Sequence, residues 1–292
     1  MKPPATKKPT ARSAPAAPPT SKRPARASKA PAKPAAARAV ERATPTRPAA
    51  LRVAPERVAA LHARLAAENP APHCELRFET PWQLLIATIL SAQSTDKTVN
   101  RVMPDVLARW PTPQALGAAD PAEVEEVVHS TGFFRNKARA IRETSRALAE
   151  RHGGEVPRDL ASLVALPGVA RKTANVVLGT AYGLPSGIAV DVHAARVSQR
   201  LGLTQEKLPE KIEQVLCRLF PEGEWVCTGH RLVLHGRYVC TARAPRCEAC
   251  PLNELCPSRE SAPRGDWQAR AEAVRREMAS RAEGFRTLGT QA

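Results

Sequence analysis

The sequence predicts an all-α protein. From Leu51 onward, apolar residues recur at the three- and four-residue spacing of amphipathic helices, and no sustained run alternates with the period of two that marks a half-buried strand. Proline also follows a hydroxyl or acidic residue where helices would begin, as in Thr80-Pro81 and Asp120-Pro121. With 292 residues, the chain is long enough for two helical bodies.

Positive charge is concentrated at the N-terminal end. The net charge is +16, and residues 1–50 hold 12 Lys and Arg, one acid (Glu41) and 11 of the 28 prolines. Such a segment cannot bury enough apolar surface to offset the entropy of ordering, so we expect a disordered basic tail over residues 1–50 that binds polyanions without selectivity. A transit peptide is the alternative, but the proline density opposes the amphipathic helix that it needs.

The chain contains no apolar stretch long enough to cross a membrane and no recognisable secretion signal. We therefore expect a protein that is neither secreted nor embedded in a membrane. Because disulfides persist mainly in secreted proteins, the seven cysteines are not expected to form a disulfide framework.

The first helices are predicted from their apolar stripes and their caps. Pro55 begins a helix, and the capping box 80–83 opens a second one, which extends to Leu90 and is apolar on all sides, as expected of a buried helix. A polar turn at 91–96 leads to an amphipathic helix. A second capping box, 120–123, opens a helix that Gly132 closes, and we expect Asn136 to cap the next helix.

Residues 159–178 have the pattern helix, tight turn, helix. The turn contains Pro167-Gly168, and Gly168 supplies conformations that a side chain would forbid. Unpaired N–H groups and the positive end of the macrodipole make the start of the second helix suitable for a phosphate oxygen. Lys172 lies one residue inside this helix, where an amine can pair with phosphate or act as a nucleophile; a solvated surface lysine is the ordinary alternative.

After a break at 183–187, the sequence predicts helices at 192–201, 208–220 and 225–238. Four cysteines then follow with the spacing Cys240-x6-Cys247-x2-Cys250-x5-Cys256. Four thiols in one short loop indicate a metal or a cluster. Structural zinc is one alternative, although this spacing is not that of a usual pair of zinc knuckles.

The stretch from Leu166 to Leu178, LPGVARKTANVVL, resembles the helix–hairpin–helix of endonuclease III, a DNA glycosylase and abasic-site lyase. The resemblance extends from about Leu51 to Cys256, and the cysteine spacing matches the [4Fe–4S] loop of that family. Ala170 is a departure, because the family usually has a second glycine there. If the position needed a positive φ, alanine would cost about 1 kcal/mol.

The resemblance implies two helical domains with a DNA-binding groove between them. Residues 74–185 would form the domain with the helix–hairpin–helix, and residues 51–73 with 186–260 would form the domain with the C-terminal iron–sulfur cluster loop. Residues 261–292, which are rich in Arg and Glu, are expected to be a frayed helix or a C-terminal tail.

The resemblance also implies roles for individual residues. Lys172 matches the catalytic lysine, and Asp191, in the string Val190-Asp191-Val192-His193, matches the catalytic aspartate; a simple N-cap is the alternative for Asp191. The cluster ligands would be the four cysteines, Cys240, Cys247, Cys250 and Cys256.

DNA contacts are implied for a further set of residues. Gln93 matches a glutamine that fills the gap left by a flipped nucleotide, and Phe133 matches a wedge that is often leucine. Phe133 could instead be a staple that packs the next helix, and His193 could be a core histidine rather than a DNA contact. The other candidate DNA contacts are Gly168, Ala170 and Arg171 in the hairpin and Arg243 and Arg246 in the cluster loop.

The function implied is that of a bifunctional glycosylase and lyase of base excision repair. It would remove oxidised pyrimidines from double-stranded DNA and cut abasic sites, as a monomer with a [4Fe–4S] cluster, in the cytoplasm at the nucleoid if the source is bacterial. The related adenine glycosylases lack the lysine and carry a further C-terminal domain, whereas only 36 residues follow Cys256 here. A non-catalytic module that binds damaged DNA is the alternative from another class.

Overall fold

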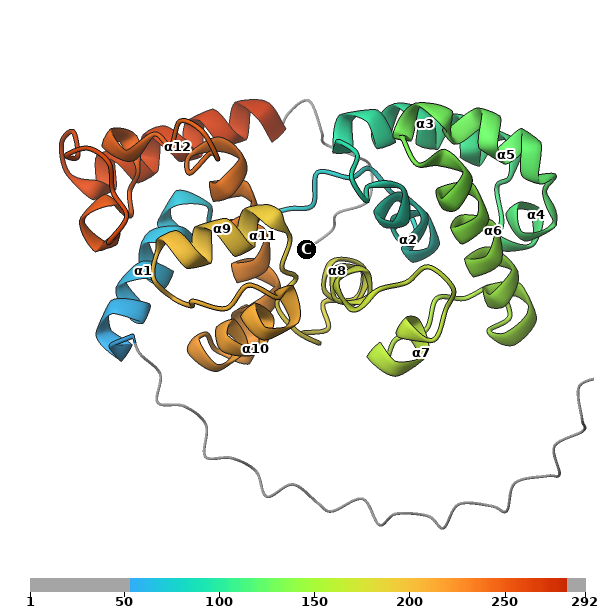
Figure 1. The fold of residues 1–292 in the computed structure, drawn as a ribbon, viewed down its shortest axis with the longest axis horizontal. Coiled ribbons are helices and arrows are strands. Elements are labelled where there is room, and N and C mark those ends of the chain that lie inside the picture. Colours follow the sequence, from blue (N-terminus) through green and yellow to red (C-terminus); the bar gives the residue numbers. More distant parts are fainter. Residues whose placement is uncertain (1–52, 283–292) are drawn as a thin grey trace, which may run out of the picture. The chain divides into compact units, whose positions relative to one another are not determined.

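The computed structural model describes residues 53–282, and these residues form helices and connecting turns with no β-strand (Figure 1). The all-α prediction is confirmed for this part of the chain. The predicted basic tail, residues 1–50, lies outside the described residues, as do residues 283–292. No helix in the described part is long and apolar enough to cross a membrane.

The helices follow one another along the chain with short connections. They are α1 (Pro55–Glu68), α2 (Pro81–Leu90), α3 (Asp96–Arg109), α4 (Pro113–Ala118), α5 (Pro121–Val128), α6 (Phe134–Arg151), α7 (Leu160–Val164), α8 (Arg171–Tyr182), α9 (Val192–Arg200), α10 (Pro209–Leu219), α11 (Trp225–Tyr238) and α12 (Trp267–Ala282). Short 3-10 helices lie at η1 (His129–Thr131), η2 (Glu222–Glu224), η3 (Cys247–Ala249) and η4 (Asn253–Leu255).

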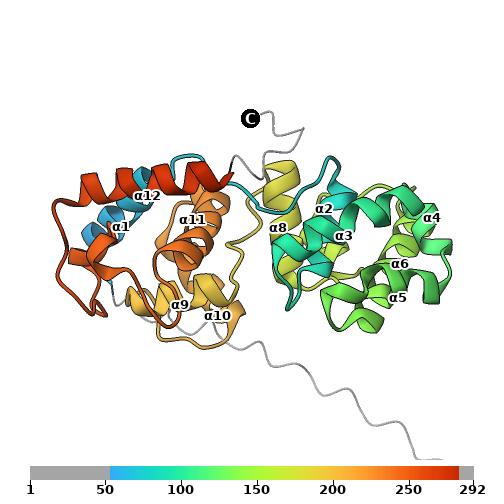
Figure 2. The ribbon, with the colours of Figure 1, turned by 90° about the horizontal axis from the view of Figure 1, so that it is seen from above.

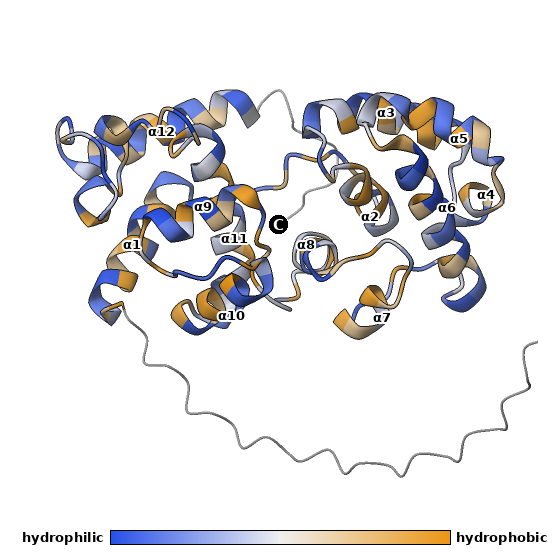
Figure 3. Ribbon diagram, in the orientation of Figure 1, coloured by the Kyte–Doolittle hydropathy of each residue, from blue (hydrophilic) through white to orange (hydrophobic). Residues whose placement is uncertain are grey.

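The first hydrophobic cluster is built from α2 to α8 around α2. Leu84, Leu85, Ile86 and Ala87 of α2 are all fully buried, and α2 is largely orange in Figure 3. Each buried Leu or Ile side chain contributes about 1.5–3 kcal/mol of transfer free energy. The expectation of a central buried helix over these residues is therefore confirmed.

A second hydrophobic cluster combines α1 with the helices that follow α8. Leu61 and Leu65 of α1 are buried with Val197 of α9, Leu216 of α10 and Leu232 of α11. A helix from the start of the described chain thus packs with helices from its end. The hairpin helix α8 contacts both α2 and α11, so it touches elements of both clusters.

The helix caps follow the sequence closely, with one shift. Thr80 Oγ1 accepts the N–H of Gln83 at 3.2 Å, but Gln83 Oε1 accepts the N–H of Glu79 rather than that of Thr80. Asp120 accepts the N–H groups at the start of α5 through Oδ1. Asp159 caps α7 in the same way, with Ser162 N at 2.8 Å.

The expected cap at Asn136 is wrong. Helix α6 begins at Phe134, three residues earlier than a cap at Asn136 predicts, and Phe133 occupies the N-cap position with left-handed dihedral angles, φ 49° and ψ 29°. Gly132, with φ 70°, ends η1 just before it. The chain therefore turns sharply enough at 132–133 to start the helix early, and Asn136 lies inside the first turn.

Of the two expectations for residues 261–292, a frayed helix or a tail, the described residues show a helix, α12, over Trp267–Ala282. It packs along α1, as Figure 2 shows from above, and buries Val274 and Met278 in the second cluster. It also holds the loop 240–256, because Arg270 Nε donates to Cys250 O at 2.9 Å and Arg246 forms an ion pair with Glu277 at 2.7 Å. Its apolar stripe is short, so the sequence alone gives a weak helix signal.

Deleting residues 267–292 is expected to destabilise the second cluster by about 3 kcal/mol or more, because Val274 and Met278 lose their burial. Loop 240–256 should then be cleaved faster in limited proteolysis. Deleting only residues 283–292 is the matched control, because it leaves α12 whole. Equal cleavage of the loop in the two shortened chains would show that α12 does not hold it.

Candidate functional site

The hairpin between α7 and α8 is packed against α6. Gly168 has φ +73°, and a Cβ placed on it would lie 2.8 Å from Ala140 Cβ, so both the backbone and the space favour glycine. The Thr144 hydroxyl donates to the Pro167 carbonyl and holds the turn to α6. Ala170 has φ −81° and ψ 162°, which any residue adopts, so alanine causes no backbone strain at this position.

The start of α8 presents free backbone donors. Within the described residues, the N–H groups of Ala170, Arg171 and Lys172 have no protein acceptor, and the first intrahelical bond comes from Ala174 N to Ala170 O. These donors lie at the positive end of the helix macrodipole. The arrangement suits an anion such as a phosphate.

One pocket contains both candidate catalytic side chains. Lys172, Val176 and Thr180 lie four residues apart on α8 and line one wall, and Asp191 lines the same pocket. Including the space open to solvent, the pocket measures about 700 Å³. The other lining residues used below are His73, Cys74, Glu75, Asp96, His230 and Arg237.

Lys172 and Asp191 are both available for chemistry. Lys172 is exposed, and its amine has no hydrogen bond or ion pair with the described residues. Asp191 caps α9: its Oδ1 accepts the N–H groups of His193 and Ala194, each at 2.8 Å. Its Oδ2 has no protein partner in the described part of the chain, so the capping role leaves one carboxylate oxygen free.

A buried carboxylate next to Lys172 holds the start of α8. Glu213 of α10 accepts two hydrogen bonds from the Arg171 fork at 2.9 Å and one from Asn175 Nδ2 at 2.9 Å. Ser186 donates to Asn175 Oδ1 at 3.0 Å and extends the network. The hydrogen bonds that Arg171 donates to Glu213 raise the pKa of Arg171. Arg171, predicted as a DNA contact, thus has its guanidinium paired within the protein.

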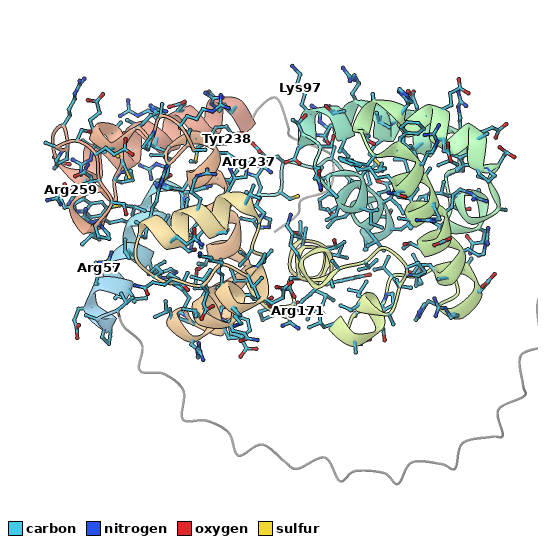
Figure 4. The ribbon with its side chains drawn as sticks, in the orientation of Figure 1. Arg57, Lys97, Arg171, Arg237, Tyr238 and Arg259 are labelled. Atoms are coloured by element: carbon cyan, nitrogen blue, oxygen red, sulfur yellow. The ribbon has the colours of Figure 1, made fainter. Side chains whose placement is uncertain are left out.

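A second ionic network forms the wall of the pocket opposite α8. Arg237 contacts Asp96 Oδ2 at 2.5 Å and also pairs with Glu75, which accepts the Tyr238 hydroxyl as well (Figure 4). Burial alone would lower the pKa of Arg237, but Asp96 and Glu75 raise it above its usual value. The network joins α11 to the start of α3, and no sequence pattern predicts it.

The far end of the pocket carries a neutral histidine. His230 Nε2 lies 3.2 Å from Thr180 Oγ1, and burial lowers the pKa of His230 to about 4. A neutral imidazole offers one donor and one acceptor. Thr180 and His230 therefore form a polar pair beyond Lys172 along α8.

Gln93 and Phe133 share an unusual backbone. They are the two non-glycine residues with positive φ in residues 53–282, at 53° and 49°. Such conformations cost about 1–2 kcal/mol and concentrate at functional sites. The Phe133 side chain is 64% exposed, so it is not a staple; the neighbouring Phe134 packs on the first cluster and stacks on His129.

The remaining candidate DNA contacts differ in whether their side chains already have partners within the protein. His193 is half-buried, which lowers its pKa, and its Nδ1 accepts a hydrogen bond from Arg196 at 3.2 Å. Arg243 is exposed and has no ion pair with the described residues. Arg246 is held by Glu277 of α12 and by the Tyr238 carbonyl.

The four cysteines surround one cavity between α9, α11 and the loop 240–256. In the described residues no three His, Cys, Asp or Glu side chains converge closely enough to hold a single metal ion, so the sulfurs line a space rather than meet at a point. Three of them face N–H donors: Cys240 faces Arg200 Nη1 at 3.4 Å, Cys247 faces Glu260 N at 3.5 Å and Cys250 faces His235 Nε2 at 3.7 Å. Donors aimed at sulfur suit thiolates that bind an iron–sulfur cluster.

Comparison with family models matches two parts of the chain. Residues 86–222 match the HhH-GPD superfamily base excision DNA repair protein, and residues 240–256 match the iron–sulfur binding domain of endonuclease III. The first match contains Lys172 and Asp191, and the second contains the four cysteines.

Full-length relatives and solved structures agree with these matches. Endonuclease III of Synechocystis sp. is 50% identical over 186 residues, which are 64% of this chain and 85% of the relative, and that of Escherichia coli K12 is 45% identical over 192 residues, 66% and 90%. A trapped endonuclease III–DNA covalent intermediate has a TM-score of 0.68 at 42% identity, covering 70% of this chain and 97% of that one. A non-covalent endonuclease III–DNA complex has the same TM-score and identity, covering 70% and 96%.

Proposed function

This chain belongs to the endonuclease III family, and from that premise we propose that Lys172 is the nucleophile that cuts the base from damaged DNA and then breaks the strand. The chain is a DNA glycosylase and abasic-site lyase of base excision repair and carries the iron–sulfur binding domain of the family. The observation that carries the proposal is the single pocket that contains the unpaired Lys172 amine and the free oxygen of Asp191.

The chemistry begins with the neutral amine of Lys172. It adds to C1′ of the deoxyribose while the bond to the base breaks, and the base leaves with a proton. The sugar ring opens to a Schiff base on Lys172. Loss of a C2′ proton then expels the 3′ phosphate by β-elimination, and water hydrolyses the imine to free the lysine. No metal ion is needed at any of these steps.

Asp191 acts through its free oxygen, Oδ2. The two N–H groups of α9 fix the carboxylate through Oδ1, so its direction into the pocket is set by the helix start. A fixed negative charge stabilises the positive charge that develops on the sugar in the transition state. It can also accept a proton from the lysine amine before the attack.

Gln93 and Phe133 hold the DNA open. A glycosylase must extrude its target nucleotide and keep the base stack from closing again. Both residues lie in exposed turns, and both keep a long side chain on a left-handed backbone. Strain of this kind persists where the exact placement of a side chain is needed, which supports a filling role for Gln93 and a wedge role for Phe133.

Phosphates bind around this opening. The free N–H groups of Ala170 and Lys172, in the turn that Gly168 makes possible, take one phosphate of the damaged strand. His193 donates through Nε2, because its Nδ1 already accepts from Arg196. Arg243 supplies an unpaired charge, whereas Arg171 and Arg246 act mainly through their protein partners.

The extruded base enters the pocket alongside α8. Val176 provides an apolar contact, and the Thr180–His230 pair provides a donor and an acceptor at the far end. Because the pocket has few polar groups on an apolar wall, the positions of those donors and acceptors decide which bases bind. We propose oxidised pyrimidines as the bases read there, and a monomer as the working unit, since one chain supplies every residue of the pocket.

The cluster is held by Cys240, Cys247, Cys250 and Cys256. When bound, it supplies a rigid cross-link for a loop that has little secondary structure of its own. The loop in turn carries Arg243 at the surface. We propose that the cluster shapes this loop for DNA phosphates.

Cleavage of duplex DNA that contains one abasic site tests the proposal. With EDTA present, the purified protein should cut the abasic strand and leave the intact duplex whole. A panel of duplexes with single oxidised pyrimidines or oxidised purines then defines the base class. Binding of abasic DNA without cleavage would instead identify a non-catalytic damage-binding module.

A further inference from the structure

A buried acid and a buried histidine meet behind the cysteine cavity. Glu68, at the end of α1, is 1% exposed, and His235 of α11 is 2% exposed. His235 Nδ1 lies 2.8 and 2.9 Å from the two carboxylate oxygens of Glu68. A buried carboxylate is costly unless it is paired, and the histidine is its partner in the described residues.

The other nitrogen of the same ring faces a cysteine of the cluster loop. His235 Nε2 lies 3.7 Å from Cys250 Sγ, and Cys250 is buried. Because Glu68 fixes the ring through Nδ1, Nε2 is directed at the sulfur. The ring thus forms a bridge from a buried negative charge to the sulfur of Cys250.

The other sulfurs meet donors of a different kind. Cys240 faces a guanidinium N–H of Arg200, and Cys247 faces the backbone N–H of Glu260. Cys250 alone among the four is met by a side chain whose orientation is fixed by a second buried side chain. An outer partner of this sort sets the direction and basicity of a metal ligand.

We propose that Glu68 and His235 form a positioning pair for the iron–sulfur cluster, in which His235 donates Nε2–H to the Cys250 thiolate and Glu68 fixes the ring for that bond. Hydrogen bonds and positive charge at a ligand sulfur stabilise the more electron-rich state of a cluster, so they raise its reduction potential. The pair thereby disfavours loss of an electron from the [4Fe–4S]2+ state. The inference goes beyond the proposed function, because it does not depend on Lys172.

Voltammetry of the DNA-bound holoenzyme tests the pair. Glu68→Gln keeps the shape but replaces the carboxylate that fixes the ring, so the contact of Nε2 with Cys250 should weaken. His235→Gln removes the ring. Each substitution should lower the reduction potential of the 3+/2+ couple; a tenfold change in the redox equilibrium corresponds to about 59 mV. The visible absorbance of the cluster should also fade faster in air in both variants.

A matched control is available in the same hydrophobic cluster. His62 also pairs with a glutamate, Glu224, at 3.3 Å, and neither residue lines the cysteine cavity. His62→Gln should leave the potential unchanged. If Glu68→Gln and His235→Gln lower only the melting temperature and leave the potential as in His62→Gln, the pair is purely structural and the proposal is wrong.

A measurement on the unaltered holoenzyme keeps the test decisive if the variants fail to hold the cluster. With 15N-labelled histidine, the oxidised cluster should show a weak 15N coupling from His235 in pulsed electron paramagnetic resonance. Absence of the 15N coupling would overturn the proposal.

Discussion

Replacing Lys172 with alanine is expected to reduce strand cleavage at an abasic site by about 1,000-fold or more, because the reaction loses its nucleophile. Borohydride should no longer trap a covalent adduct with abasic DNA. The free N–H groups at the start of α8 stay in place, so DNA affinity should change by less than about threefold. Gel analysis of single-turnover reactions in EDTA measures both the cleavage and the adduct.

Lys211→Ala is the matched control for this experiment. Lys211 is an exposed lysine on the neighbouring helix α10 and lies outside the pocket of Lys172. The Lys211→Ala variant should cleave abasic DNA and form the borohydride-trapped adduct as the unaltered chain does. An adduct of equal yield from Lys172→Ala would place the nucleophile elsewhere.

Replacing Glu213 with alanine is expected to lower the free energy of unfolding by about 3 kcal/mol, near the low end for breaking a buried ion pair. Glu213 is 7% exposed and Arg171 is 44% exposed, so solvent compensates the arginine in part. Asn175 is buried and would lose an acceptor. The start of α8 would loosen as a consequence, and with it the position of Lys172.

Chemical denaturation of the two variants Glu213→Ala and Glu210→Ala measures the effect. Glu210 lies on the same helix but is exposed, so its removal should cost little. Single-turnover cleavage should fall in Glu213→Ala at saturating DNA, since the lysine is displaced rather than removed. Equal stability of the two variants would show that the network around Glu213 contributes nothing measurable.

The helix starts could be predicted because each cap is a local event. Thr80, Asp120 and Asp159 each bind an N–H within three residues along the chain, so the sequence contains both partners side by side. The buried helix α2 could also be predicted, since the apolar run from Leu84 to Ala87 is followed by Ile89 and Leu90 and covers all sides of the helix. The early start of α6 was not, because Phe133 gives no sign of a left-handed backbone.

The ionic networks could not be predicted because their partners are far apart in sequence. Arg171 and Glu213 are 42 residues apart, and Arg246 and Glu277 are 31 apart. The sequence predicts DNA contacts for both arginines, because it does not show which acid pairs with a basic residue near a motif. A hint was present in α10, where Glu213 follows the buried Ile212 and precedes the buried Leu216. An acid on the apolar face of a helix indicates a buried counter-charge.

The candidate site was named from the family motif, and the structure supplies the reasons for its geometry. Ala170 looked like a possible strain from sequence alone, yet its extended backbone accepts alanine freely. Asp191 required a choice between cap and catalyst, and its two oxygens allow both. Such points depend on dihedral angles and on individual atoms, which residue types do not encode.

The left-handed backbone of Gln93 and Phe133 places the stability of the protein in conflict with the function proposed for these residues. Glycine at either position would relieve about 1 kcal/mol of conformational energy, so selection for heat resistance alone would drift toward glycine at both. The role proposed for Gln93 and Phe133, holding the DNA open, needs the side-chain bulk that glycine lacks. Glycine substitutions that stabilise these two turns would therefore weaken the function proposed for them at the same time.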